Sequence, residues 1–189
     1  MLKLFREIWQ RLRWMSRQDR IGPDVLSNHW KLHFKSTMKS LCLDKFAFFG
    51  DDAEVRPGAY VVFCSRVHLG RRVVVRPACM LFSDPGGFIT IEDDVMMGSG
   101  VHIYVSNHQF SNPNIPIIDQ GSYKFSHVVL RKGCWIGANA IILPGVEIGE
   151  NSVVGAGSIV TKSVTARTLV AGNPAKFVQN IESGVNNAE

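Results

Sequence analysis

The chain lacks a long hydrophobic run. No stretch of about twenty apolar residues occurs in its 189 residues, so we expect no membrane-spanning helix. The N-terminus also lacks the uninterrupted apolar core and small-residue cleavage site of a signal peptide, which predicts a cytoplasmic protein. Cysteine is scarce and shows neither the spacing of a metal site nor a disulfide framework, so we expect no metal and four reduced core thiols. These are Cys42, Cys64, Cys79 and Cys134.

The positive charge is confined to the first quarter of the chain. Residues 1–47 hold ten Lys and Arg against four Asp and Glu, whereas residues 48–189 hold eleven against twelve. Basic residues alone do not indicate nucleic-acid binding, and no recognised motif or spaced aromatic platform accompanies them. We therefore expect no nucleic-acid partner.

Aliphatic or similar residues recur every six positions from residue 49 onwards, in groups of three. A period of six suits neither an amphipathic helix nor a free hairpin, but it suits short strands joined by corners and stacked in rungs. The pattern predicts an all-β fold, a parallel β-helix with one aliphatic column inside. The anchors are Phe49, Val55, Val61, Leu69, Val75, Leu81, Ile91, Met97, Ile103, Leu130, Ile136, Ile142, Ile148, Val154 and Val160.

Three repeats make one coil, and the anchors define about five coils. We divide the chain into a basic, amphipathic helical segment at 1–47, the β-helix at 48–165 with a loop insertion at 109–129, and a C-terminal cap and tail at 166–189. Glycines follow several anchors and are expected at corners that need unusual backbone angles or close approach. These are Gly50, Gly70, Gly98, Gly137, Gly149 and Gly155.

Residues 2–17 form an amphipathic helix on a helical wheel. Leu4, Ile8 and Leu12 share its apolar face, and Arg6 and Arg13 lie opposite. One interpretation is association with a membrane surface at the inner face of the cell membrane. The other is that this helix caps the open end of the β-helix or packs on a neighbouring subunit. We favour the second, because an amphipathic stripe is more often part of a core.

Four sequence segments resemble the hexapeptide-repeat acyltransferases, the family of galactoside, maltose and nodulation-factor O-acetyltransferases. This family includes enzymes that acetylate saccharides of surface polysaccharides. They are GVHIYVSNH at 100–108, the loop with PIIDQG, the run CWIGANAIILPGVEIGENSVVGAGSIVTKSV and the terminal AGNPAK. The resemblance covers roughly residues 49–180. It implies a left-handed winding, a homotrimer and an acetyl-CoA site between adjacent subunits.

The resemblance also implies site residues. His108 matches the catalytic histidine, and imidazole is suited to remove a proton from an acceptor hydroxyl near neutral pH. The backbone amide of Ala138 is the candidate donor to the oxyanion. Trp135 is expected beside the reactive end of the cofactor, although a packing role at a corner is equally open. The residues expected along the coenzyme are Trp135, Ala138, Ala156, Thr161, Lys162 and Lys176.

The acceptor is expected to be a saccharide that forms part of a surface polysaccharide or of its lipid-linked precursor. Arg76 and Asp84 match positions that hold an asparagine and an aspartate against sugar hydroxyls in the galactoside enzyme. The arginine departs from that pattern and favours an acceptor with an acidic group. Asn107 and Tyr123 are candidates because they lie near His108 or the loop in sequence. A plain corner role stays open for Arg76 and Asp84.

Other functions use the same scaffold. A free-sugar or xenobiotic acetyltransferase is the nearest alternative. A zinc hydratase like the γ-class carbonic anhydrases would need three converging histidines, for which His68, His102 and His108 are the candidates. His102 and His108 are six residues apart, whereas the corresponding histidines of that family are five residues apart. A catalytically silent scaffold is the third alternative.

Overall fold

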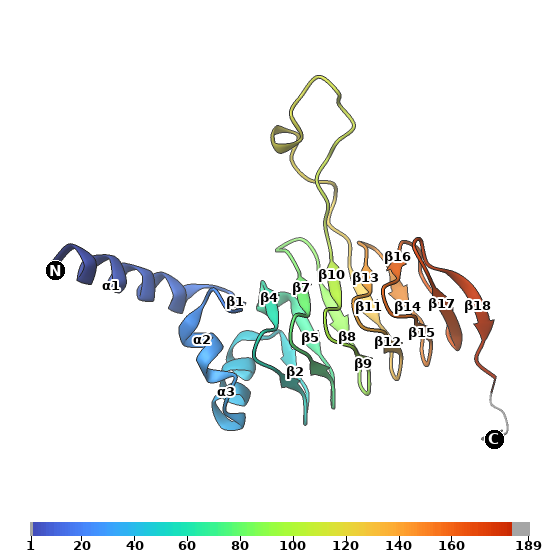
Figure 1. Ribbon diagram of the computed structural model, residues 1–189, viewed down its shortest axis with the longest axis horizontal. Helices are drawn as coiled ribbons and strands as arrows, with labels where there is room; N and C mark the ends of the chain where they lie inside the picture. Colours follow the sequence, from blue (N-terminus) through green and yellow to red (C-terminus); the bar gives the residue numbers. More distant parts are fainter. Residues whose placement is uncertain (1, 183–189) are drawn as a thin grey trace.

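The chain folds into a prism of stacked parallel strands with helices at its N-terminal end (Figure 1). The structure is a computed structural model that describes residues 2–182, so the last part of the predicted C-terminal tail lies outside the described residues. Within this range, no helix combines the length and hydropathy needed to cross a membrane.

Three faces of the prism are built from short strands. Sheet 1 consists of β4 (Tyr60–Val62), β7 (Met80–Phe82), β10 (His102–Tyr104), β13 (Ile141–Ile142) and β16 (Ile159–Val160), with β1 (Arg20–Ile21) antiparallel to β4. Sheet 2 consists of β2 (Phe48–Phe49), β5 (Val67–Leu69), β8 (Ile89–Ile91), β11 (Val128–Leu130) and β14 (Glu147–Ile148). The third face holds β3 (Glu54–Val55), β6 (Val74–Val75), β9 (Met96–Met97), β12 (Trp135–Ile136), β15 (Val153–Val154), β17 (Thr168–Ala171) and β18 (Lys176–Asn180).

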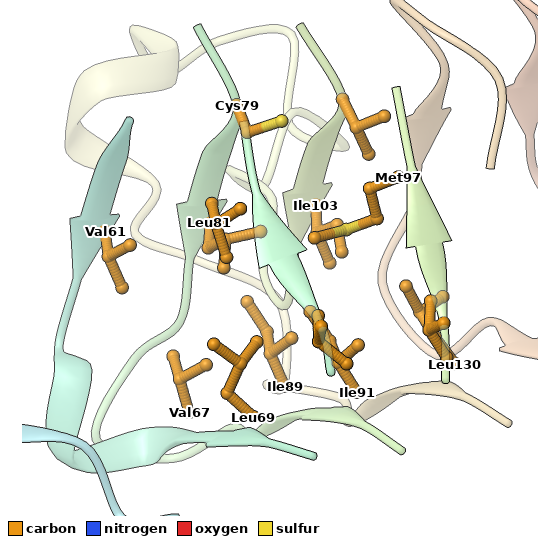
Figure 2. Packing of buried hydrophobic residues seen from close by; sticks show 14 of the residues in the cluster. Val61, Val67, Leu69, Cys79, Leu81, Ile89, Ile91, Met97, Ile103 and Leu130 are labelled. Carbon is orange, nitrogen blue, oxygen red and sulfur yellow. The ribbon is translucent and has the colours of Figure 1, made fainter. Parts of the chain in front are cut away.

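The strands make five complete coils and the start of a sixth, which confirms the predicted parallel β-helix. The sixth begins where Val164 bridges Ile148, and it continues as β17 beside β15. All the predicted anchors are buried and point into one column, as Figure 2 shows for part of it. The four cysteines are buried and free, as expected.

The predicted insertion boundaries are wrong by a few residues. Val128 and Val129 belong to strand β11, so the long loop runs over 105–127 rather than 109–129. Two shorter insertions occupy 63–66, where the 3-10 helix η1 (Cys64–Arg66) lies, and 83–88. The error arises because β5, β8 and β11 each bury two side chains, and a strict six-residue count marks only the second.

Glycines at the corners allow the backbones of neighbouring coils to approach each other closely. A Cβ on Gly137 would lie 2.4 Å from the backbone nitrogen of Ala156 in the next coil, which is closer than any real contact. The same holds for Gly70, whose Cβ would lie 2.5 Å from the carbonyl carbon of Glu92. Neither glycine has a positive φ, so of the two predicted reasons only close approach applies to them.

The helix that covers the first coil is not the one that the sequence predicts. Helix α3 (Lys35–Lys45) packs on β2 and β3 and covers the first coil, while α2 (Leu26–Lys31) connects it to α1 (Leu2–Arg17). Helix α1 contacts α2 and points away from the prism (Figure 1). Of the preferred interpretation, the part in which the amphipathic helix itself caps the prism is therefore wrong, while packing on a neighbouring subunit stays a prediction. The opposite end is closed by β17 and β18, which form an antiparallel pair.

Candidate functional site

The long loop stands away from the prism and contains the 3-10 helix η2 (Ile117–Asp119) (Figure 1). His108 lies near its base, where the two sides of the loop pair. It bridges Ser122 on the returning strand of the loop, and its backbone N–H donates to Oδ1 of Asn107 at 2.9 Å. The backbone N–H of Tyr123 donates to the carbonyl of Asn107 at 2.9 Å. The structure therefore brings Asn107, His108 and Tyr123 together, and all three are exposed.

The insertion at 83–88 contacts this base. The backbone N–H of Phe88 donates to Nδ1 of His127 at 3.1 Å, and the rings of these two residues lie 5.2 Å apart. Asp84 opens the same insertion, and its carbonyl accepts a hydrogen bond from Gly87 at 2.9 Å. We call this corner between sheets 1 and 2, with its insertions at 63–66, 83–88 and 105–127, the loop edge.

The corner between the third face and sheet 1 is built from small residues. A Cβ on Gly98 would lie 2.4 Å from the nitrogen of Ala138, and Ala156 stacks beneath Gly137 in the same way. We call this column of Gly98, Ala138 and Ala156 the small-residue edge. The carbonyl of Ala138 accepts from Gly157 at 2.8 Å, whereas its N–H donates to no described residue. That amide is free to donate to a bound oxygen.

A cleft of about 360 Å³ opens beside the small-residue edge. Trp135 lines it and is 49% exposed, paired in register with Met96 on β9, so this tryptophan does not pack into the core. The Nε of Arg76 donates to the carbonyl of Met97 at 2.9 Å, and no ion pair involves this guanidinium within residues 2–182. Sequence reasoning missed Met96, although its pairing with Trp135 follows from the repeat.

The remaining candidates lie toward the C-terminal end. Thr161 and Lys162 follow β16 and are exposed, and Lys162 lines a cleft of about 190 Å³ with Phe177. Lys176 begins β18 next to Phe177 and is also exposed. Two cations thus lie at the same end of the prism.

The candidate residues fall into two groups on opposite edges of sheet 1. Asp84, Asn107, His108 and Tyr123 lie at the loop edge, while Arg76, Trp135, Ala138 and Ala156 lie in or beside the small-residue edge. Strand β10 (His102–Tyr104) runs across sheet 1 between the two edges. At about 3.3 Å per residue this strand alone spans about 10 Å, which is beyond hydrogen-bond reach. One chain therefore does not bring His108 to the Ala138 amide.

The three histidines of the zinc alternative occupy different places. His68 lies on sheet 2 with its ring 6.2 Å from Phe88, and His102 lies on sheet 1 with Nδ1 3.2 Å from the Tyr104 hydroxyl. His108 lies in the loop. In the part of the chain that the structure describes, no three potential metal ligands converge.

The sequence and fold are similar to those of known enzymes. Residues 127–162 match the family model "Bacterial transferase hexapeptide (six repeats)". The chain is 32% identical to galactoside O-acetyltransferase of Escherichia coli strain K12 over 143 residues, which cover 76% of this chain and 68% of that enzyme.

Two solved structures share the fold. A galactoside acetyltransferase in complex with coenzyme A superimposes with a TM-score of 0.73 at 29% identity, covering 82% of this chain and 77% of the other. A maltose O-acetyltransferase from Clostridium difficile 630 gives a TM-score of 0.69 at 28% identity, covering 79% and 77%. With its six-residue repeat, its histidine at the base of a long loop and these relatives, the chain belongs to the hexapeptide-repeat acyltransferases.

Proposed function

We propose that this protein transfers an acetyl group from acetyl-CoA to a hydroxyl of a saccharide, in a surface polysaccharide or its lipid-linked precursor. The observation that carries this proposal is the exposed His108 at the base of the long loop, in a chain of this family. The coenzyme A bound to the galactoside acetyltransferase structure supports the choice of donor.

His108 acts as the general base in this reaction. Its imidazole takes the proton of the acceptor hydroxyl while the oxygen attacks the thioester carbonyl carbon, so a C–O bond forms and the C–S bond breaks. The proton then passes from His108 to the leaving thiolate. The free amide of Ala138 donates to the carbonyl oxygen as negative charge develops there. No acyl-enzyme forms.

The small-residue edge suits the coenzyme. Ala138 and Ala156 leave room for the pantetheine arm to approach the backbone, and Trp135 forms a wall at its reactive end. Thr161 lies further along the same path. Lys162 and Lys176 supply positive charge for the phosphates at the C-terminal end of the prism.

The two edges act together only across an interface, so we propose a homotrimer. His108 of one subunit would face the small-residue edge of its neighbour, because within one chain strand β10 separates the two edges. A closed threefold ring gives every subunit one such contact on each side. The long loop protrudes from the prism (Figure 1), and in the proposed trimer it would reach towards a neighbour.

Arg76 supports an acceptor that carries an acidic group. Arg72 in the same cleft is paired with Asp94 at 2.6 Å, whereas Arg76 pairs with no carboxylate of the described residues. An uncompensated guanidinium beside an exposed indole favours a uronic acid or a phosphorylated sugar over a neutral one. Asp84, Asn107 and Tyr123 of the neighbouring loop edge would hold the sugar hydroxyls.

Calorimetric titration with acetyl-CoA tests the proposal, followed by an acceptor panel that pairs each neutral sugar with its acidic counterpart. We expect saturable binding near one molecule per chain. His108→Ala should lower turnover by about 10²–10⁴ with nearly unchanged acetyl-CoA affinity. Ala156→Trp should abolish that affinity instead. Absence of acetyl-CoA binding by the wild-type protein would refute the proposal.

A further inference from the structure

Helix α1 exposes an apolar face that no other part of the described chain covers. Phe5 is 69% exposed, Leu4 and Trp9 are 60% exposed, and Ile8 and Leu12 about half. Of the large apolar side chains described in this helix, only Met15 is buried. The helix points away from the prism over most of its length (Figure 1). An exposed apolar stripe of this size marks an interaction surface.

Helix α2 extends the apolar surface. Leu26, itself 67% exposed, lines a groove of about 580 Å³ together with Leu4, Ile8 and Leu12. Phe5 and Trp9 do not line this groove. The apolar surface is therefore continuous between the two helices, and Phe5 and Trp9 extend it beyond the groove.

The charges around this face have one predominant sign. Residues 2–17 contain five Lys and Arg and a single glutamate, which gives a net charge of +4. The guanidinium of Arg11 lies 4.3 Å from the centre of the Trp14 ring, and that of Arg13 lies 5.3 Å from Trp9. Indole rings flanked by cations are typical of the boundary between lipid tails and headgroups.

We propose that α1 binds flat on the surface of a membrane that contains anionic phospholipid. With 16 residues, the helix is about 24 Å long, and its apolar side chains would enter the headgroup boundary while its arginines meet the lipid phosphates. A second copy of the chain is a poorer occupant, because it would bring two helices of charge +4 against each other. An anionic lipid surface matches both the apolar stripe and the charge.

This attachment would bring the enzyme to lipid-linked acceptors. In the proposed trimer, three copies of α1 project from the same end of the assembly, so several helices would engage one surface and strengthen binding beyond that of a single helix. That consequence rests on the proposed trimer. Binding of α1 itself does not.

Co-sedimentation of the full chain with vesicles tests the proposal. We expect binding to vesicles of phosphatidylcholine with about a third phosphatidylglycerol, at least about tenfold stronger than to phosphatidylcholine alone and weakened by added salt. The double variant Phe5→Glu with Trp9→Glu should lose more than about tenfold in affinity. Arg6→Gln should lose about fivefold.

Leu43→Glu is the matched control, since Leu43 is 57% exposed on α3, away from α1. It should bind vesicles as the wild type does, and thermal unfolding should show that all variants fold. Equal binding to neutral and anionic vesicles, no binding to either, or full binding by the double variant would overturn the proposal. Self-association that the double variant abolishes, without vesicle binding, would assign the face to a second copy instead.

Discussion

Replacing Gly98 with alanine perturbs the proposed oxyanion donor without touching a polar side chain. The new Cβ would lie 2.4 Å from the nitrogen of Ala138 and 2.6 Å from its Cα, whereas ordinary contacts begin at 3.4 Å. The neighbouring coil must therefore move by about 1 Å at the position of the Ala138 amide. Both clashing atoms belong to backbone, so rotation of a side chain does not relieve the contact.

The size of the effect follows from this displacement. A catalytic donor must be held within about 0.5 Å of its productive position, so a shift of about 1 Å removes most of its contribution. Loss of one oxyanion donor costs about 10²–10³ in kcat. Gly98→Ala should therefore lower kcat by about that factor, and it should also lower the melting temperature.

Gly50→Ala provides the matched control. Its Cβ would lie 2.5 Å from the nitrogen of Arg71, at the corner between sheet 2 and the third face and remote from both site edges. Both variants should lose similar stability, but only Gly98→Ala should lose kcat, measured by thiol release from acetyl-CoA with an accepted sugar. If the two folded variants retain the same kcat, the assignment of the Ala138 amide is refuted.

Three further predictions concern the core, the thiols and the acceptor. Ile136 is fully buried in the column, so Ile136→Ala should lower the free energy of unfolding by about 2–5 kcal/mol in urea titration, and a loss below about 1 kcal/mol would contradict the packing. Burial raises the pKa of the Cys42 and Cys134 thiols to about 12, so at pH 8 both should react with a disulfide reagent only after unfolding. Rapid reaction of the native protein would contradict this. Arg76→Gln should lower kcat/KM about 10–100-fold for acidic acceptors and little for neutral ones, and an equal loss for both would remove Arg76 from acceptor recognition.

The core of the fold could be predicted because every sixth side chain is an apolar anchor that faces the interior. Each anchor, such as Val61 or Leu81, faces inward in every coil, so the repeat is visible without knowledge of the corners. The insertion boundaries could not be predicted in the same way. Val67, Ile89 and Val128 are buried two positions before the anchors of their strands, because strands that follow the loop edge begin sooner.

The capping helix was missed because its signal is local and weak. Residues 35–45 show no strong apolar stripe, yet Met38, Leu41 and Cys42 of α3 are buried. The strongly amphipathic α1 led to the capping prediction instead, although its main contact is with α2 rather than with the prism. A helical wheel shows that an apolar face exists and does not show what covers it.

The division of the candidate site between two edges also lay beyond the sequence. Arg76 and Asp84 are eight positions apart, but strand β7 carries the chain across sheet 1 between them. Motif matching names such residues together without regard to the distance between them in one chain. Only the coil geometry shows that a single chain holds them apart.

Mixing two inactive variants tests the shared site most directly. His108→Ala lacks the base at the loop edge, and Ala156→Trp lacks the coenzyme path at the small-residue edge, so neither should be active alone. In trimers assembled at random from equal amounts of the two variants, about a quarter of all interfaces combine one intact edge from each variant. We expect co-expressed or refolded mixtures to recover up to about a quarter of wild-type kcat. Mixed trimers with no more activity than the separate variants would contradict a site formed between chains.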